Sequence, residues 1–214
     1  MATTATEGLR ERKKRQTREA IARAAMRLFK ARGFDAVTVA EIANAADVSE
    51  KTVFNYFPSK EDLVFQGGAE RRAALIEAIR ARPRDASLVE PFRRWTMQFI
   101  DRVERDPVES IVGVPRLVAR SPSLRDRLFL AWEEEAAMLA PVIAEEAGQS
   151  ADELVPLVVA RTLTWTHRVV FRAAFTRLLA GEDQRDVAAD LRVQAQQAYD
   201  TLERGLRDYG LNQS

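Results

Sequence analysis

The sequence contains no cysteine and a single histidine, His167. Disulfide bonds and thiolate chemistry are therefore excluded, and so are Cys–His catalytic pairs and His-rich metal sites. No glycine-rich phosphate loop occurs, and the carboxylates are spread along the chain rather than gathered in one segment. We expect no catalytic residue, no metal site and no cofactor. The lack of cysteine also fits a reducing cytoplasm.

Long apolar runs are missing as well. The longest extends from Leu154 to Ala160 and is cut by Arg161, so it is much shorter than a membrane span. The N-terminus is basic but has no apolar segment behind it, unlike a secretion signal. The sequence therefore predicts a cytoplasmic protein with no membrane partner.

Glycine and proline are sparse, with nine and eight among 214 residues, and long alternating β-branched runs are absent. Ala, Leu, Arg and Glu are abundant instead, and hydrophobic residues make up 46% of the chain, which is enough for a buried core. Apolar residues recur at helical spacing. These features predict an all-α protein of about nine helices.

The net charge of +1 conceals an uneven distribution. Residues 1–60 hold 12 Lys and Arg against 7 Asp and Glu, whereas the remainder holds 21 against 25. A run of four basic residues, which ends at Arg15, contributes much of the excess. Such a run can lie along a nucleic-acid backbone, enter a minor groove or remain a solvated tail. The motif that follows it favours a nucleic-acid partner.

Residues 33–60 carry two short helical patterns with a tight corner between them. Thr38 and Glu41 have the spacing of a capping box at the start of the first pattern, and Ser49 is a second N-cap. Asp47 occupies the corner, where a residue that tolerates a positive φ is needed. A proline directly after the second pattern ends it. This order is typical of a helix-turn-helix.

The run G-F-x-x-V-T-V-x-x-I-A-x-x-A-x-V-S-x-x-T-V-F-x-Y-F-P-S-K-E-D-L resembles the DNA-binding signature of the TetR family of bacterial transcriptional repressors, and the similarity covers Thr17 to Leu63. Asp47 stands where Gly is usual, and Phe54 stands where a Tyr is frequent, so a hydroxyl that often touches phosphate is missing. The resemblance implies a homodimeric repressor that binds a palindromic operator in double-stranded DNA and responds to a small molecule.

The second short helix should supply the contacts to DNA. Lys51, Thr52 and Asn55 suit base edges or the adjoining backbone. Residues at helix ends suit phosphate, because free N–H groups, hydroxyls and an ammonium gather there. The predicted phosphate contacts are Thr38, Ser49, Tyr56 and Lys60, with Arg15 from the basic run. Thr38 and Ser49 can instead act only as caps, and Phe54 and Phe57 are expected in the core.

The sequence predicts a DNA-binding domain with three helices over residues 1–58 and a larger helical domain for ligand binding and dimerisation over 59–214. A helix that begins at Ser59 and runs towards Arg82 would link them. Further N-caps are expected at Ser87, Ser150 and Asp183. Prolines 107, 115 and 122 are expected to delimit short pieces.

The last two long helices, expected over 150–181 and from residue 183 onward, are predicted to form the dimer contact. The first of them is apolar on two faces. One face holds Leu154, Val158, Trp165 and Val169, and the other holds Val159, Leu163, Val170 and Ala174. A helix that is apolar all round must be buried on both sides. The resemblance implies a four-helix dimer contact there, whereas an ordinary monomer core is the alternative.

Aromatic residues are frequent in the larger domain. Most belong to a core, but some can line a cavity for an apolar effector. The proposed lining consists of Trp95, Phe99, Trp132, Trp165, His167 and Phe171. Arg161, Arg168 and Arg172 either meet an acidic ligand or, as we expect, pair with residues 133–135. Two alternatives remain: a regulator without an inducer, whose larger domain serves only dimerisation or protein interaction, and a helical enzyme or carrier.

Overall fold

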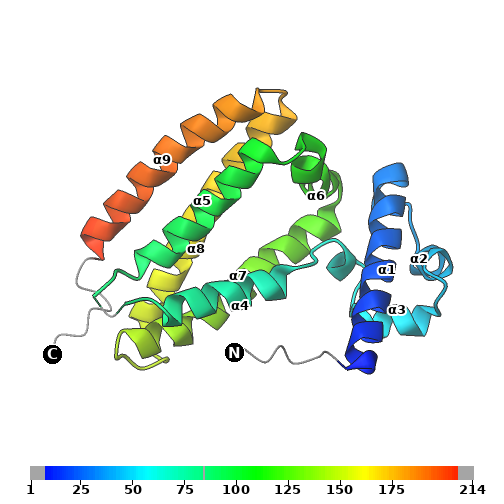
Figure 1. Ribbon diagram of the computed structural model, residues 1–214, viewed down its shortest axis with the longest axis horizontal. Coiled ribbons are helices and arrows are strands. Elements are labelled where there is room, and N and C mark those ends of the chain that lie inside the picture. The colour runs from blue at the N-terminus through cyan, green and yellow to red at the C-terminus, as the bar shows by residue number, and fades with distance from the viewer. Residues whose placement is uncertain (1–7, 84, 207–214) are drawn as a thin grey trace. The chain divides into compact units, whose positions relative to one another are not determined.

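The computed structural model describes residues 8–83 and 85–206, so the outer ends of the two predicted domains and Arg84 lie outside the described residues. Within these ranges the chain forms nine α-helices, one 3-10 turn and no β-strand, which confirms the all-α prediction (Figure 1). The elements are α1 (Leu9–Arg32), α2 (Val39–Ala45), α3 (Glu50–Tyr56), η1 (Glu61–Leu63), α4 (Gly68–Arg80), α5 (Val89–Arg105), α6 (Val108–Arg120), α7 (Pro122–Glu146), α8 (Leu154–Leu179) and α9 (Gln184–Gly205).

The contacts divide the chain into two compact units. The head unit comprises the residues up to Gln66 together with Leu117–Arg125. The body unit comprises Gly67–Arg116 and the residues from Asp126 onward. In the head unit, α1 packs against α2 and η1, and α2 packs against α3. In the body unit, α5, α8 and α9 pack on one another and α4 packs on α5 (Figure 1).

The predicted capping box at the start of α2 is present. The Thr38 hydroxyl accepts a hydrogen bond from the Glu41 N–H at 3.2 Å, and the Glu41 carboxylate accepts one from the Thr38 N–H at 2.8 Å. Arg32, at the end of α1, donates to the same carboxylate at 2.7 Å. The hydrogen bond from Arg32 and then those from Thr38 lower the pKa of Glu41 to about 2. The start of α2 is thereby fastened to the end of α1.

The corner between α2 and α3 also follows the prediction. Asp47 has a φ of 54°, and it is the one residue other than glycine with a positive φ in the described part of the chain. The Val48 N–H then donates to the carbonyl of Ala43 at 3.0 Å, and the Ala43 side chain is buried. Asp47 thus takes the left-handed conformation that a glycine would adopt without a steric penalty.

The helix expected to begin at Ser59 is an error of the sequence analysis. Ser59 and Asp62 do form a capping box, with the Asp62 N–H donating to the serine hydroxyl at 3.2 Å, but only the short turn η1 follows. Gly67 then has a φ of 74°, and a side chain there would begin 3.1 Å from the Arg71 guanidinium. The chain therefore leaves the helical path at Gly67, and α4 starts at Gly68.

Pro115 does not delimit a segment, because it lies inside α6. A proline inside a helix removes one backbone hydrogen bond, while α6 buries Val112 and Leu117 on either side of it. Pro122 is the first residue of α7, a position that needs no N–H partner. Asp183 caps α9 as expected, since its carboxylate accepts from the N–H groups of residues 185 and 186.

Two of the serines expected to be N-caps do not stand directly before a helix. The Ser87 hydroxyl accepts from the Val89 N–H at 3.1 Å, and α5 begins at Val89 rather than directly after the serine. Glu153 accepts from the Ser150 N–H at 3.0 Å, which closes a turn, and α8 begins only at Leu154. Short polar pairs of this kind stabilise turns as well as helix ends, so their spacing alone does not locate the first helical residue.

The left-handed corner at Asp47 leads to a prediction about stability. Asp47→Val should lower the free energy of unfolding by about 1–2 kcal/mol, because a β-branched side chain is strained at positive φ. Asp47→Asn is the matched control, since asparagine tolerates this conformation. Urea denaturation of both variants measures the difference. Equal stability of the two variants would show that the corner is not strained.

Candidate functional site

The short helix α3 has one buried face and one exposed face. Val53, together with Phe57 just after the helix, is buried in the head unit, whereas Lys51 and Asn55 are exposed. The Ser49 hydroxyl caps the helix by accepting from the Thr52 N–H at 3.1 Å. A helix of seven residues is too short to be stable in isolation. The packing of its buried face must therefore fix the direction of its exposed face.

Arg18 of α1 holds the other end of α3. Its guanidinium donates to the backbone carbonyl of Tyr56 at 2.8 Å and lies 4.4 Å from the centroid of the Phe57 ring. A cation near the carbonyl end of a helix is favourable, because the last carbonyl groups lack partners within the helix. α1 therefore positions the last turn of α3.

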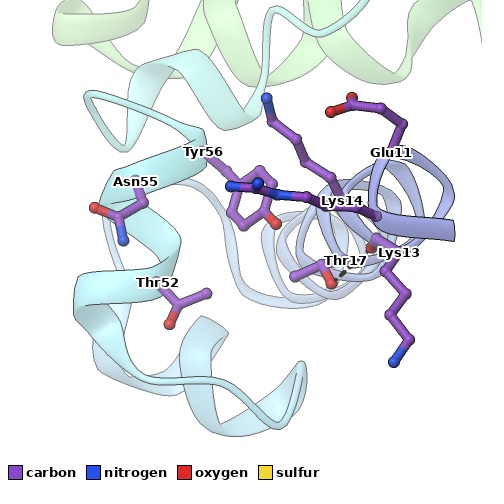
Figure 2. A pocket seen from close by; sticks show the side chains of 8 residues that line it. Glu11, Lys13, Lys14, Thr17, Thr52, Asn55 and Tyr56 are labelled. Atoms are coloured by element: carbon purple, nitrogen blue, oxygen red, sulfur yellow. Dashed lines mark hydrogen bonds between the residues drawn. The ribbon is translucent and has the colours of Figure 1, made fainter. Parts of the chain in front are cut away.

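An open concavity of about 550 Å³ lies between α1 and α3 in the head unit. Figure 2 shows α3 on one side with Thr52, Asn55 and Tyr56, and α1 on the other with Lys14 and Thr17. The complete lining is Arg10, Glu11, Lys13, Lys14, Thr17, Thr52, Asn55 and Tyr56. Three cations thus face one carboxylate, beside hydroxyl and amide groups. This chemistry suits a phosphate-bearing ligand.

The basic run near the N-terminus is helical, since α1 begins at Leu9. Lys13 and Lys14 line the concavity, but Arg15 does not. The Arg15 guanidinium lies 3.8 Å from the Glu19 carboxylate on the same helix. Helical periodicity separates the side chains of neighbouring residues, so only part of the run faces α3.

The remaining residues predicted for this site lie in different surroundings. The Ser49 hydroxyl hydrogen-bonds to the Thr52 hydroxyl at 2.8 Å in addition to capping α3. The Lys60 ammonium lies 4.2 Å from the centroid of the Phe34 ring. Thr38 is engaged in its capping box. The structure therefore brings Thr52, Asn55 and Tyr56 to the concavity and places the other predicted residues outside it.

Phe54 was expected in the core but is 48% exposed, so that expectation is wrong. It lies three residues after Lys51 and next to Asn55, on the exposed face of α3. An aromatic residue in a helix is usually buried, which is why its type alone was misleading. The spacing from the buried pair Val53 and Phe57 already indicated that Phe54 points away from the core.

In the body unit, four of the six residues predicted to line an effector cavity come together. The ring of Trp95 stacks on that of His167, with centroids 3.8 Å apart and an interplanar angle of 14°. Phe99 lies 5.8 Å and Phe171 6.1 Å from His167, again between ring centroids. α5 and α8 thus contribute to one aromatic cluster around the single histidine.

Trp132 and Trp165 lie apart from this cluster and contact each other instead. Their ring centroids are 6.2 Å apart at an angle of 86°. Arg168 and Arg161 form the ion pairs that the sequence predicted, with Glu135 at 3.0 Å and Glu133 at 2.5 Å respectively.

His167 is held by buried hydroxyl groups. Its Nδ1 lies 2.9 Å from the Thr96 hydroxyl, which in turn lies 2.7 Å from the Tyr199 hydroxyl. Burial, followed by the positive charges of Arg168, Arg102 and Arg71, lowers the pKa of His167 to about 3. The imidazole is therefore neutral at physiological pH.

This neutral histidine makes the protein sensitive to acid. The unfolded chain takes up a proton near the ordinary pKa of about 6.5, whereas the folded chain does so only near 3. Stability should consequently fall as the pH drops through this window, by about 2 kcal/mol from this residue between about pH 7 and pH 5. His167→Asn, whose amide oxygen can accept from Thr96, should lose that part of the slope in urea denaturation. An unchanged slope would show that folding does not lower the pKa of His167.

No helix in the described ranges combines the length and apolar character needed to cross a bilayer. The same residues contain no group of three His, Asp or Glu side chains arranged to hold a metal ion.

The sequence matches two protein families. Residues 21–66 match the model of bacterial regulatory proteins of the tetR family, and residues 86–207, more than half of the chain, match the model of the MftR C-terminal domain. The transcriptional regulator TcmR of Streptomyces glaucescens is 31% identical over 176 residues, which are 79% of this chain and 78% of TcmR. MftR of Mycobacterium tuberculosis is 26% identical over 201 residues, which are 91% of this chain and 93% of MftR.

Solved structures share the fold at lower sequence identity. SmeT in its complex with triclosan matches with a TM-score of 0.58 and 18% identity, over 89% of this chain and 91% of SmeT. A regulator from Mesorhizobium loti assigned to the TetR family matches with a TM-score of 0.54 and 19% identity, over 89% and 96%. The family consists of transcriptional regulators, which are generally not enzymes. With its helix-turn-helix and these matches, the chain belongs to the TetR family of DNA-binding transcriptional regulators.

Proposed function

We propose that the protein is a homodimeric repressor that binds a palindromic operator and is released by a small, largely apolar ligand. In this proposal residues 1–58 bind DNA, and residues 59–214 bind the ligand and form the dimer. The observation that carries it is the exposed face of α3, which stands beside a basic concavity on α1.

The proposed DNA contacts are of two kinds, those to base edges and those to the phosphate backbone. Lys51, Phe54 and Asn55 lie on the exposed face of α3 and would meet base edges in the major groove. Lysine suits guanine acceptors, asparagine pairs with adenine, and an apolar ring packs on the thymine methyl group. The cations of α1 line the concavity beside α3 and would meet phosphate, where contacts position the protein without reading the sequence. Thr38, Ser49, Tyr56, Lys60 and Arg15 would add contacts to the backbone.

A dimer is supported by the two faces of α8. Val159, Leu163 and Ala174 are buried in the body unit, whereas Val158 and Val169 are more than half exposed. The exposed apolar face also contains Leu154 and Trp165, and Val193 on α9 is exposed as well. An apolar stripe of this length on a helix favours a partner surface. Two copies paired through α8 and α9 would present two α3 helices to half-sites about one DNA turn apart.

The response to a ligand is supported by the cluster around His167, where aromatic rings surround a hydrogen-bonded polar chain. A ligand that prefers the arrangement unable to bind DNA lowers operator affinity, with couplings of about 1–3 kcal/mol being typical. The rival proposal is a regulator without an effector. In that case no compound would release the operator, although sequence-specific DNA binding would remain.

Asn55 and Lys14 provide a paired test of the DNA interface, with selection of bound sequences from a random pool as the first step. Asn55→Ala should relax the preference at defined base pairs and cost about 1–3 kcal/mol on the selected operator. Lys14→Met should weaken binding to all sequences alike and reduce the slope of log K against log salt by about one. Loss of affinity without a change of base preference in Asn55→Ala would contradict a base contact.

The dimer contact can be tested by placing a charge on the exposed stripe. Val169→Glu should weaken self-association by at least about tenfold, because the contact would bury an unpaired carboxylate. Leu130→Glu is the matched control, since Leu130 is equally exposed on α7. Sedimentation equilibrium measures association, and circular dichroism checks that both variants fold. If Val169→Glu associates like the unmodified protein, the dimer uses another surface.

A further inference from the structure

The corner between α6 and α7 is tied to the head unit by a buried hydrogen bond. Ser121 stands between the two helices, and its side chain is buried. Its hydroxyl donates to the Asp35 carboxylate at 2.9 Å, although the two residues are 86 positions apart in the sequence. Asp35 belongs to the loop between α1 and α2. The hydrogen bond therefore joins the α6–α7 corner to the segment that leads into the helix-turn-helix.

The start of α7 also suits the charge of Asp35. α7 begins at Pro122, directly after Ser121, and is 25 residues long. The Ser121 carbonyl accepts from the Arg125 N–H at 3.2 Å, which is the spacing of a first helical turn. The N-terminal end of a helix carries a partial positive charge, so a carboxylate there is favourable. Asp35 thus meets both a hydrogen-bond donor and a favourable helix end.

Apolar side chains hold the α6–α7 corner in the head unit as well. Leu117 near the end of α6 and Leu124 in the first turn of α7 are both buried. Both lie in the segment 117–125, which belongs to the head unit, whereas the rest of α6 and α7 belongs to the body unit. The head unit is therefore completed by a segment from the middle of the chain.

Short hydrogen bonds continue from the neighbour of Asp35 to α2. The carbonyl of Ala36 accepts from the Arg32 guanidinium at 2.6 Å. The same guanidinium donates to the Glu41 carboxylate at 2.7 Å, and Glu41 closes the capping box with Thr38. Since α2 packs on α3, the loop held by Asp35 is linked to the helix proposed to read DNA.

In the other direction, α6 reaches the core of the body unit. Val112 is buried in the same core cluster as Phe99, and Phe171 packs against that cluster. Phe99 and Phe171 also surround His167. Pro115 lies between Val112 and the α6–α7 corner and removes one backbone hydrogen bond from α6. Helices bend most readily at such a position, so α6 can change its course between the two units.

We infer that the hydrogen bond between Ser121 and Asp35 is a regulatory contact, through which a change in the body unit alters the position of α2 and thereby of α3. A ligand that displaces α6 would shift the α6–α7 corner and with it the loop before α2. The inference rests on the proposed reading of DNA by α3 and specifies how the body unit acts on that helix. Because coupling between two sites is reciprocal, DNA bound by the head unit must affect the corner in turn.

The reciprocal effect can be measured without knowing the effector. Hydrogen exchange of the full-length protein is compared with and without the operator selected from a random pool. Operator binding should slow amide exchange at residues 117–125 by at least about threefold, because it favours the state in which the corner is held. In Ser121→Ala this slowing should disappear, while DNA still protects residues 50–56. No slowing at 117–125 in the unmodified protein, or equal slowing in Ser121→Ala, overturns the inference.

Operator affinities of further variants separate a positioning role from a general effect on folding. Ser121→Ala and Asp35→Ala should each weaken binding by at least about threefold, as the loss of one hydrogen bond implies. The double variant should bind no more weakly than either single variant, since both remove the same contact. Base preference and the salt dependence of binding should stay unchanged, because no contact to DNA is lost. Additive losses in the double variant would overturn the inference.

Two controls accompany these variants. Asp35→Asn keeps an acceptor for the Ser121 hydroxyl and should bind the operator more tightly than Asp35→Ala. Ser110→Ala removes a serine hydroxyl that is also on α6 but donates to the nearby Pro107 carbonyl at 2.7 Å, so its operator affinity should not change. Circular dichroism checks that all variants fold. Equal affinity of Asp35→Asn and Asp35→Ala would show that the hydrogen bond does not position α2, which overturns the inference.

The measurements also separate this inference from the proposed DNA contacts. If Asn55→Ala leaves the base preference unchanged but the operator still slows exchange at 117–125, the regulatory contact stands and the role of α3 fails. If Asn55→Ala relaxes the preference while exchange at 117–125 does not respond to the operator, the DNA contacts stand and the regulatory contact fails.

Discussion

The head unit depends on the stabilisation of a helix that cannot exist by itself. α3 has only seven residues, so its own backbone hydrogen bonds are too few to stabilise it. Contacts with the residues around it must supply the missing stability. The Ser49 hydroxyl accepts from the Thr52 N–H, Arg18 donates to the carbonyl of the last helical residue, and Asp47 turns the chain before the helix. Because these contacts come from α1 and from the corner, the exposed face of α3 is fixed before any partner arrives.

The body unit is stabilised differently, because its centre contains hydrogen-bonded polar side chains as well as aromatic rings. Thr96, His167 and Tyr199 join α5, α8 and α9 through one hydrogen-bonded chain. A buried polar chain restricts how three helices can slide past one another, since each hydroxyl must keep its partner. The same chain holds the buried, neutral imidazole against the aromatic cluster.

Sequence patterns predicted the local structure of the head unit well, because capping and corner geometry depend on residues only a few positions apart. The capping box of Thr38 and the positive φ of Asp47 are examples. The sequence patterns failed where two local signals disagreed. At Ser59 a capping box predicts a long helix, but Gly67 interrupts the helix eight residues later. Residue type also misplaced Phe54.

Contacts between segments that are distant along the chain could not be predicted from the sequence. The hydrogen bond between Thr96 and His167 joins residues 71 positions apart, and no local pattern marks either partner. Aromatic composition pointed to a cluster, but it did not separate Trp95 and Phe171 from the pair Trp132 and Trp165.

The two faces of α8 have a consequence for how such proteins diverge. Substitutions at Val158 or Val169 alter few contacts within one chain, whereas those at Leu163 or Ala174 alter its core. If pairing uses the exposed face, mutations there can change the choice of partner at little cost to folding. Related regulators in one cell could then evolve to avoid mixed pairs, since specificity requires only that the wrong combination fit poorly.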